Sequence, residues 1–92
     1  MCGVGRCGTW RTLAHDGVSP DIMVTAKGLA GGYAPLGAAL MTEDVYRTIA
    51  DTFGTIASVH TYSGHTAACA AGLAVQKVII RDGLVAKCRT DG

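Results

Sequence analysis

A lysine directly before a glycine-rich loop is the residue in this sequence whose type and position best suit covalent chemistry. Lys27 follows the apolar run of residues 22–26 and opens the segment KGLAGGYAP. The run is typical of a short buried strand, and ligands of α/β proteins bind beyond the carboxyl ends of such strands. Partial burial there favours a neutral amine that attacks carbonyl groups, and Gly28, Gly31 and Gly32 would let the backbone approach a ligand closely. A lysine that ends a strand and points into solvent is the simpler alternative.

A second candidate site is the segment HTYSG, residues 60–64, which precedes an expected helix. Free N–H groups and the dipole at a helix N-terminus bind phosphate, and Thr or Ser hydroxyls can add donors. N-capping by Ser63 or Thr66 is the more common use of such a segment. The histidines show no ligand spacing typical of a metal site, and Ser63 lacks the G-x-S-x-G turn of a nucleophilic serine.

The segment GVGRCG, residues 3–8, matches the dinucleotide-binding pattern G-x-G-x-x-G. A dinucleotide site requires a strand before the glycines and a helix after them. Only two residues precede this segment, and no long helical period follows it. The pattern therefore favours a glycine-rich turn over a NAD or FAD site.

The elements expected to position these residues alternate between strands and helices. Apolar runs predict strands over residues 22–26 and 36–41, with further turn and strand signals over residues 51–64. Thr42 is a candidate N-cap for a helix over residues 43–50. A second helix is expected over residues 66–80, apolar on nearly every side and therefore buried, and another begins near residue 84. This is an α/β pattern with too few strands to close a sheet.

The composition is that of a protein interior. Of the 92 residues 49% are hydrophobic and 16% are charged, against a usual charged share of about 25%. A chain of this length makes one small domain at most, and these proportions are too apolar for a chain that must cover its own surface. The composition therefore predicts part of a larger fold.

Charge, hydropathy and cysteines exclude several classes of protein. The net charge is +1 with scattered basic residues, so neither nucleic acid nor an anionic membrane is an expected partner. No apolar run reaches the length of a transmembrane helix, and no signal peptide is apparent. Cys69 lies in an alanine run and is expected to be buried. Free thiols in a reducing cytoplasm are expected for all four cysteines, Cys2, Cys7, Cys69 and Cys88.

Three segments in order resemble one enzyme family. GVGRCGTW, PDIMVTAKGLAGGYAPLGA and HTYSGHTAACAAGLAV are similar to motifs of class III pyridoxal-phosphate (PLP) aminotransferases, the omega-aminotransferase group of fold type I. The resemblance extends from Gly3 to about Val85. It implies that residues 1–92 form part of the PLP-binding large domain, a three-layer α/β/α domain whose sheet is incomplete here.

The resemblance also assigns roles to two residues. Lys27 is implied to form the Schiff base with PLP and then, once released by the substrate, to move a proton from the substrate Cα to the C4′ carbon of the cofactor. Thr61 matches the threonine that binds the cofactor phosphate from the neighbouring subunit of a homodimer. Gly31, Gly32 and Tyr33 are implied to lie near the active site and the subunit interface. The implied reaction transfers an amino group from an amine or amino acid to a 2-oxo acid.

The chain departs from the family pattern at its ends. The family's aspartate that pairs with the pyridinium nitrogen is expected before Met1, and the small domain is expected beyond the C-terminal end. We therefore expect an internal fragment that is inactive alone. The alternatives are a PLP-dependent aminomutase or decarboxylase-like relative, or a non-catalytic truncated chain that binds PLP weakly.

Overall fold

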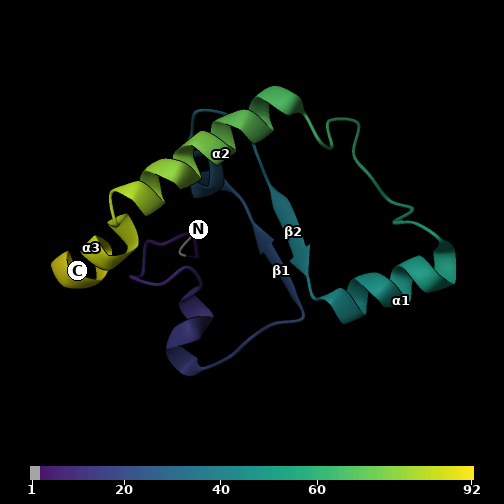
Figure 1. Cartoon of the computed structure of the whole chain (residues 1–92), viewed down its shortest axis with the longest axis horizontal. Coiled ribbons are helices and arrows are strands. Elements are labelled where there is room, and N and C mark those ends of the chain that lie inside the picture. Colours follow the sequence, from purple (N-terminus) through teal and green to yellow (C-terminus); the bar gives the residue numbers. More distant parts are fainter. Residues whose placement is uncertain (1–2) are drawn as a thin grey trace.

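The computed structural model describes residues 3–92 and has the α/β character expected from the sequence (Figure 1). A two-stranded sheet is combined with α-helices and short 3-10 helices (η). In chain order the elements are η1 (Thr12–Asp16), β1 (Ile22–Thr25), η2 (Lys27–Ala30), β2 (Ala38–Met41), α1 (Glu43–Phe53), α2 (Thr66–Arg81) and α3 (Leu84–Asp91). The strands predicted over residues 22–26 and 36–41 and the predicted helices are confirmed, with shorter strands and a longer α1 than expected.

The two strands are antiparallel and pair from Ile22 with Met41 to Thr25 with Ala38. This register places the end of β1, and with it Lys27, at the edge of the sheet where β2 begins. The expectation that β1 is buried is wrong, because Val24 is 79% exposed. Among the described residues β2 is the only strand paired with β1, and it leaves much of that strand uncovered.

Helix α2 crosses over η2, and this contact forms the small core of the molecule (Figure 1). Ala30 of η2 is 0% exposed and Ala68 of α2 is 7% exposed, and they are the buried hydrophobic residues of the described chain. The prediction that α2 is buried all round is wrong, because Leu73 and Ile80 are exposed. Only the stripe of α2 that faces η2 is covered, so the helix has a second apolar face directed to solvent.

Helix α1 extends away from this core (Figure 1). It begins after Thr42, the expected N-cap, although the Thr42 side chain makes no capping bond. Its exposed surface carries an ion pair from Arg47 to Glu43 at 2.8 Å. The strand signals of the following segment are not realised, because residues 55–60 are irregular.

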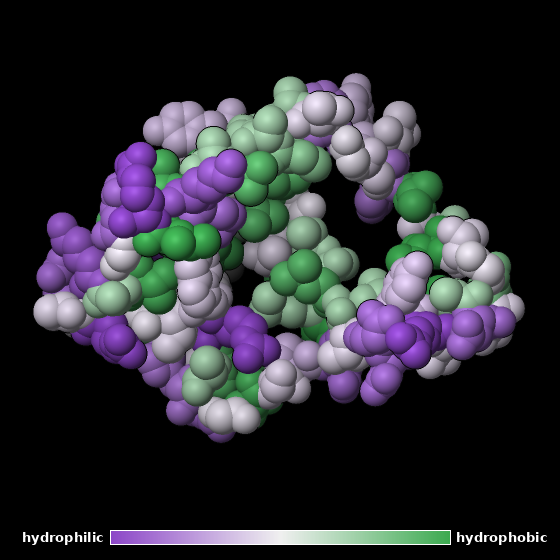
Figure 2. All heavy atoms as spheres, in the orientation of Figure 1, coloured by the Kyte–Doolittle hydropathy of each residue, from purple (hydrophilic) through white to green (hydrophobic). Residues whose placement is uncertain are grey.

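The result is an open molecule. Its radius of gyration is 15.0 Å, whereas a compact domain of this length has a radius of about 12 Å. Figure 2 shows the opening between α1 and the rest of the chain, with hydrophobic side chains around it. The described residues therefore leave apolar surface uncovered on several elements.

The GVGRCG segment is a turn packed against α3. The N–H of Gly8 donates to the carbonyl of Gly5 at 3.0 Å, and both glycines have positive φ, 75° and 79°. A Cβ on Gly8 would lie 2.6 Å from the Cβ of Arg89, so only glycine fits there. The element that follows is the five-residue η1, and the expectation of no long helix after the turn is confirmed. The two residues before the turn lie outside the described part of the chain.

The cysteines differ from expectation in one respect. Cys69 is exposed rather than buried, because it lies on the face of α2 that η2 does not cover. Cys7, Cys69 and Cys88 are unpaired, and Cys2 lies outside the described residues. None of the described helices is long and apolar enough to cross a membrane.

Candidate functional site

Lys27 occupies a strained backbone position directly after β1. Its φ is 54°, and among the described residues it is the only one other than glycine with a positive φ. For an L-residue this left-handed conformation costs about 1–2 kcal/mol, and such strain is concentrated at functional sites. The side chain is exposed, contrary to the partial burial expected. Within residues 3–92 its amine has no hydrogen-bond or ion-pair partner.

The loop after Lys27 is held by short-range backbone bonds. The N–H of Leu29 donates to the carbonyl of Ala26 at 3.2 Å, and the N–H of Tyr33 donates to the carbonyl of Ala30 at 3.0 Å. Gly31 ends the turn with a φ of 61°, and a Cβ there would lie 3.2 Å from Cγ2 of Val75 on α2. Gly31 therefore allows a sharp turn and a close approach to α2. The close approach to a ligand predicted for Gly28, Gly31 and Gly32 stays a prediction.

The turn before α2 is held by its own residues. The N–H of Ser63 donates to the carbonyl of His60 at 2.9 Å, and the N–H of His60 donates to Oγ of Ser63 at 3.1 Å. His65 caps the helix, because its Nδ1 accepts from the N–H of Ala68 at 3.2 Å. The expectation that Ser63 or Thr66 provides the cap is therefore wrong, and the Ser63 hydroxyl instead braces the turn.

Thr61 lies in the middle of this turn and is exposed. In the described part of the chain its hydroxyl has no partner. The first N–H groups of α2 follow within a few residues, and helix geometry leaves such groups without intrahelical acceptors. The turn thus carries a hydroxyl without a partner among the described residues, a few positions before the first residue of α2, and helix N-termini can bind anions.

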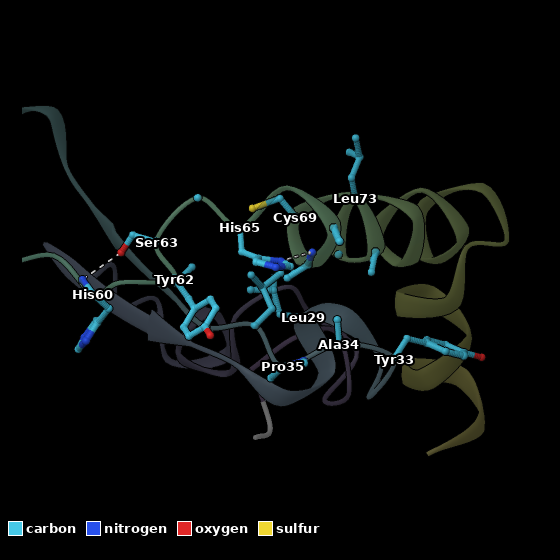
Figure 3. Close-up of a pocket in the computed structure, with 18 of the residues that line it drawn as sticks. Leu29, Tyr33, Ala34, Pro35, His60, Tyr62, Ser63, His65, Cys69 and Leu73 are labelled. Atoms are coloured by element: carbon cyan, nitrogen blue, oxygen red, sulfur yellow. Dashed lines mark hydrogen bonds between the residues drawn. The ribbon is translucent and has the colours of Figure 1, made fainter.

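A groove of about 910 Å³ brings the two motifs together through their neighbours (Figure 3). Leu29, two residues after Lys27, lines it from η2, while His60 and Tyr62, on either side of Thr61, line it from the turn. In Figure 3 Tyr62 lies toward Leu29 and Pro35, across from the start of α2. Neither Lys27 nor Thr61 is among the lining residues, so the structure joins the two segments without bringing these two side chains into the groove.

Sequence reasoning missed two residues that organise this region. His65 is one of the histidines without metal-ligand spacing, but its place directly before α2 is a cap position. Gln76 interrupts the apolar pattern of α2 together with Lys77, and its Nε2 donates to the carbonyl of Leu29 at 2.8 Å. This polar pair is the sequence signal for Gln76, and it does not identify a partner 47 residues away.

The residues present fit pyridoxal phosphate in their chemistry. A primary amine without a partner can form a Schiff base with the cofactor aldehyde, and Lys27 provides one. Hydroxyls and helix N-termini can bind a phosphate, and Thr61 carries a hydroxyl in the turn that leads into α2. No group of three or more potential metal ligands occurs among the described residues.

Comparisons with known proteins identify one family. The model of the family "Aminotransferase class-III" matches residues 1–92. The chain is 44% identical over its whole length to an aminotransferase of Gibberella zeae, of which it covers 18%. It is 38% identical to the taurine–pyruvate aminotransferase of Bilophila wadsworthia, covering 100% of this chain and 21% of that enzyme.

A solved structure shows the same arrangement of elements. The S-selective transaminase from Arthrobacter sp. matches with a TM-score of 0.88 and 36% identity, covering 98% of this chain and 19% of the enzyme. The chain thus spans about a fifth of the length of the relatives it matches. Class III aminotransferases are PLP-dependent enzymes, and the chain has the fold of a part of such an enzyme. On both sequence and structure, the chain belongs to the class III aminotransferase family.

Proposed function

We propose that this chain is the lysine-bearing part of the large domain of a PLP-dependent aminotransferase, which transfers an amino group from an amine or amino acid to a 2-oxo acid. One observation carries the proposal: the exposed Lys27 amine lacks a partner in residues 3–92 and stands on a strained, glycine-bounded turn. Residues 1–92 would act as one portion of that domain, because the relatives are about five times longer.

Lys27 would have two tasks at its Nζ atom. It would hold the cofactor covalently until the amino group of a substrate takes its place. Bound PLP supplies an electron-withdrawing ring that makes the substrate Cα–H bond acidic. With PLP bound, the Lys27 amine would take the proton from the substrate Cα and return it to the cofactor, as a general base and then a general acid.

Thr61 would bind the cofactor phosphate, with its hydroxyl donating to a phosphate oxygen. We infer that this contact is made across a homodimer. Thr61 is absent from the groove that its neighbours line, and apolar side chains beside it are exposed, Val59 by 72% and Tyr62 by 78%. Apolar residues exposed together indicate an interaction surface, so a second subunit would both cover this turn and receive its hydroxyl.

Reduction with borohydride tests the proposal. The full-length protein is incubated with PLP, reduced, digested and mapped by mass spectrometry. One cofactor adduct per subunit is expected, on Lys27, and none in Lys27→Ala. The variant Lys77→Ala, which removes an exposed lysine from α2, keeps the adduct. A reduced adduct on another lysine, or none in folded protein, would overturn the assignment.

A further inference from the structure

Helix α2 reaches the lysine-bearing turn through one side chain. Nε2 of Gln76 donates to the carbonyl of Leu29 at 2.8 Å, and Leu29 is two residues after Lys27 within the same short helix η2. The bond is partly buried and joins residues 47 positions apart. The other bonds of this loop connect residues three positions apart along the backbone. Gln76 is therefore the residue whose side-chain hydrogen bond connects the Lys27 loop to helix α2.

Close packing of α2 against the loop restricts movement around the Gln76–Leu29 hydrogen bond. Ala68, Gly72 and Gln76 recur every four residues and lie on one face of α2. Ala68 and Gly72 are the buried residues of that helix. A Cβ on Gly72 would lie 2.5 Å from Cδ2 of Leu36, so the backbone of α2 lies against the loop that follows Lys27. The carbonyl of Leu29 is thereby held at a fixed distance from the helix axis.

Lys27 needs such a support, because its own backbone does not favour the observed conformation. Its φ of 54° persists only where surrounding structure enforces it. Ala30, the last residue of η2, is 0% exposed, and Leu29 is held from α2. Because Leu29 and Ala30 are fixed, Lys27 at the start of η2 has little conformational freedom. The direction of the Lys27 side chain is fixed as a result.

We propose that Gln76 is a positioning residue for the Lys27 amine. It does not touch the reacting atoms, but its hydrogen bond to the Leu29 carbonyl holds the turn in the conformation that determines the position of Lys27 Nζ. This inference rests on the proposed function of Lys27 and adds to it the residue that sets the geometry. Without the bond, the described residues hold η2 by apolar packing against α2 and by its own backbone bonds, and Lys27 can relax from its strained conformation.

The test compares Gln76→Leu with Lys77→Leu in the full-length PLP-bound protein. Gln76→Leu keeps the bulk and removes the donor, while Lys77→Leu makes a change of similar size at the adjacent exposed position. We expect kcat per bound cofactor to fall about 10- to 100-fold in Gln76→Leu, as for a misplaced reactive group, with KM for the amino donor little changed. The pH midpoint of the visible absorbance of the lysine–cofactor Schiff base should shift as well. Lys77→Leu should alter neither.

Gln76→Glu provides the second variant, because it preserves side-chain shape and replaces the N–H donor by a carboxylate oxygen. It should also lower kcat per bound cofactor. A merely structural Gln76 would reduce thermal stability or cofactor occupancy and leave kcat per bound cofactor and the pH midpoint at their wild-type values. That result in either folded variant overturns the inference. If wild-type protein forms no reducible adduct on Lys27, the proposed function fails and the positioning role fails with it; if the adduct forms and the Gln76 variants match wild type, only the positioning role fails.

Discussion

The turn that carries Lys27 and the turn that carries Thr61 line one groove through their neighbours, but they are held in different ways. The Lys27 turn has a buried residue, Ala30, and a side-chain bond from α2. The Thr61 turn has all of residues 60–65 exposed and is held by bonds among its own residues.

The difference follows from what each turn is proposed to do. An amine that moves a proton must be fixed relative to the substrate by its own chain. The small core of the chain accordingly lies between the Lys27 turn and α2, with Ala30 and Ala68 buried. A hydroxyl that reaches into another subunit gains its surroundings only on assembly. An unpacked turn with exposed apolar neighbours is the expected form of such a segment before its partner covers it.

The largest expected effect separates the two turns by function. Lys27→Ala should lower kcat by at least about 10²- to 10⁴-fold, because the proton-transfer group is lost. Thr61→Val should instead weaken cofactor binding about 10-fold or more, the value of one hydrogen bond to a charged group. Activity at saturating PLP and cofactor titration measure the two quantities.

Thr55→Val, in the exposed irregular segment before the turn, is the matched control and should change neither quantity. If Thr61→Val left the affinity for PLP unchanged while the protein remained folded, the phosphate role of this turn would be wrong. If Lys27→Ala retained wild-type kcat, the division of roles between the turns would disappear.

A pair of glycines compares the packing of the two turns directly. Gly31 and Gly64 both have positive φ, 61° and 69°, so alanine is strained at either position. A Cβ at Gly31 would also meet Val75 at 3.2 Å and Tyr33 at 3.3 Å, whereas nothing lies within 4 Å at Gly64. Gly31→Ala should therefore cost about 2–3 kcal/mol and Gly64→Ala about 1 kcal/mol.

Urea unfolding of the full-length protein measures both losses. Equal losses would mean that the Lys27 turn can move away from α2, contrary to the comparison. A larger loss at Gly64 would mean that the Thr61 turn is covered in the assembled enzyme, and the contrast would then hold only for the separate chain.

Local sequence patterns predicted the elements but not their surroundings. The apolar run before Lys27 and the long apolar period after His65 correctly indicated a strand and a helix, because both depend on neighbouring residues. Burial of β1 and α2 was predicted wrongly, since it depends on what covers each face. The bond from Gln76 to Leu29 could not be foreseen, because no local pattern reports the partner of an amide 47 residues away.

The cap of α2 tests how the Thr61 turn is connected to the helix. His65→Ala removes the Nδ1 acceptor of the Ala68 N–H and should cost about 1 kcal/mol, as the loss of an N-cap usually does. His65→Asn restores an acceptor of a strongly preferred capping type and should recover most of that stability. Hydrogen exchange at the Ala68 amide reports the cap itself. Unchanged exchange in His65→Ala would show that the turn does not depend on this bond.

The smallest effect concerns the strain at Lys27. Lys27→Gly and Lys27→Ala both remove the amine, but glycine accepts a φ of 54° without steric cost while alanine does not. After allowing for the greater freedom of glycine in the unfolded chain, Lys27→Gly should be more stable than Lys27→Ala by about 0.5–1 kcal/mol. Urea midpoints of the two cofactor-free variants measure the difference. If Lys27→Ala were as stable as Lys27→Gly, the turn would not enforce the left-handed conformation at residue 27. The proposed role of α2 in maintaining that conformation would then be wrong. If Lys27→Gly is the more stable variant, adding Gln76→Leu to both should remove the difference in stability. Without the bond to α2, residue 27 can leave the left-handed conformation, so alanine is no longer strained there.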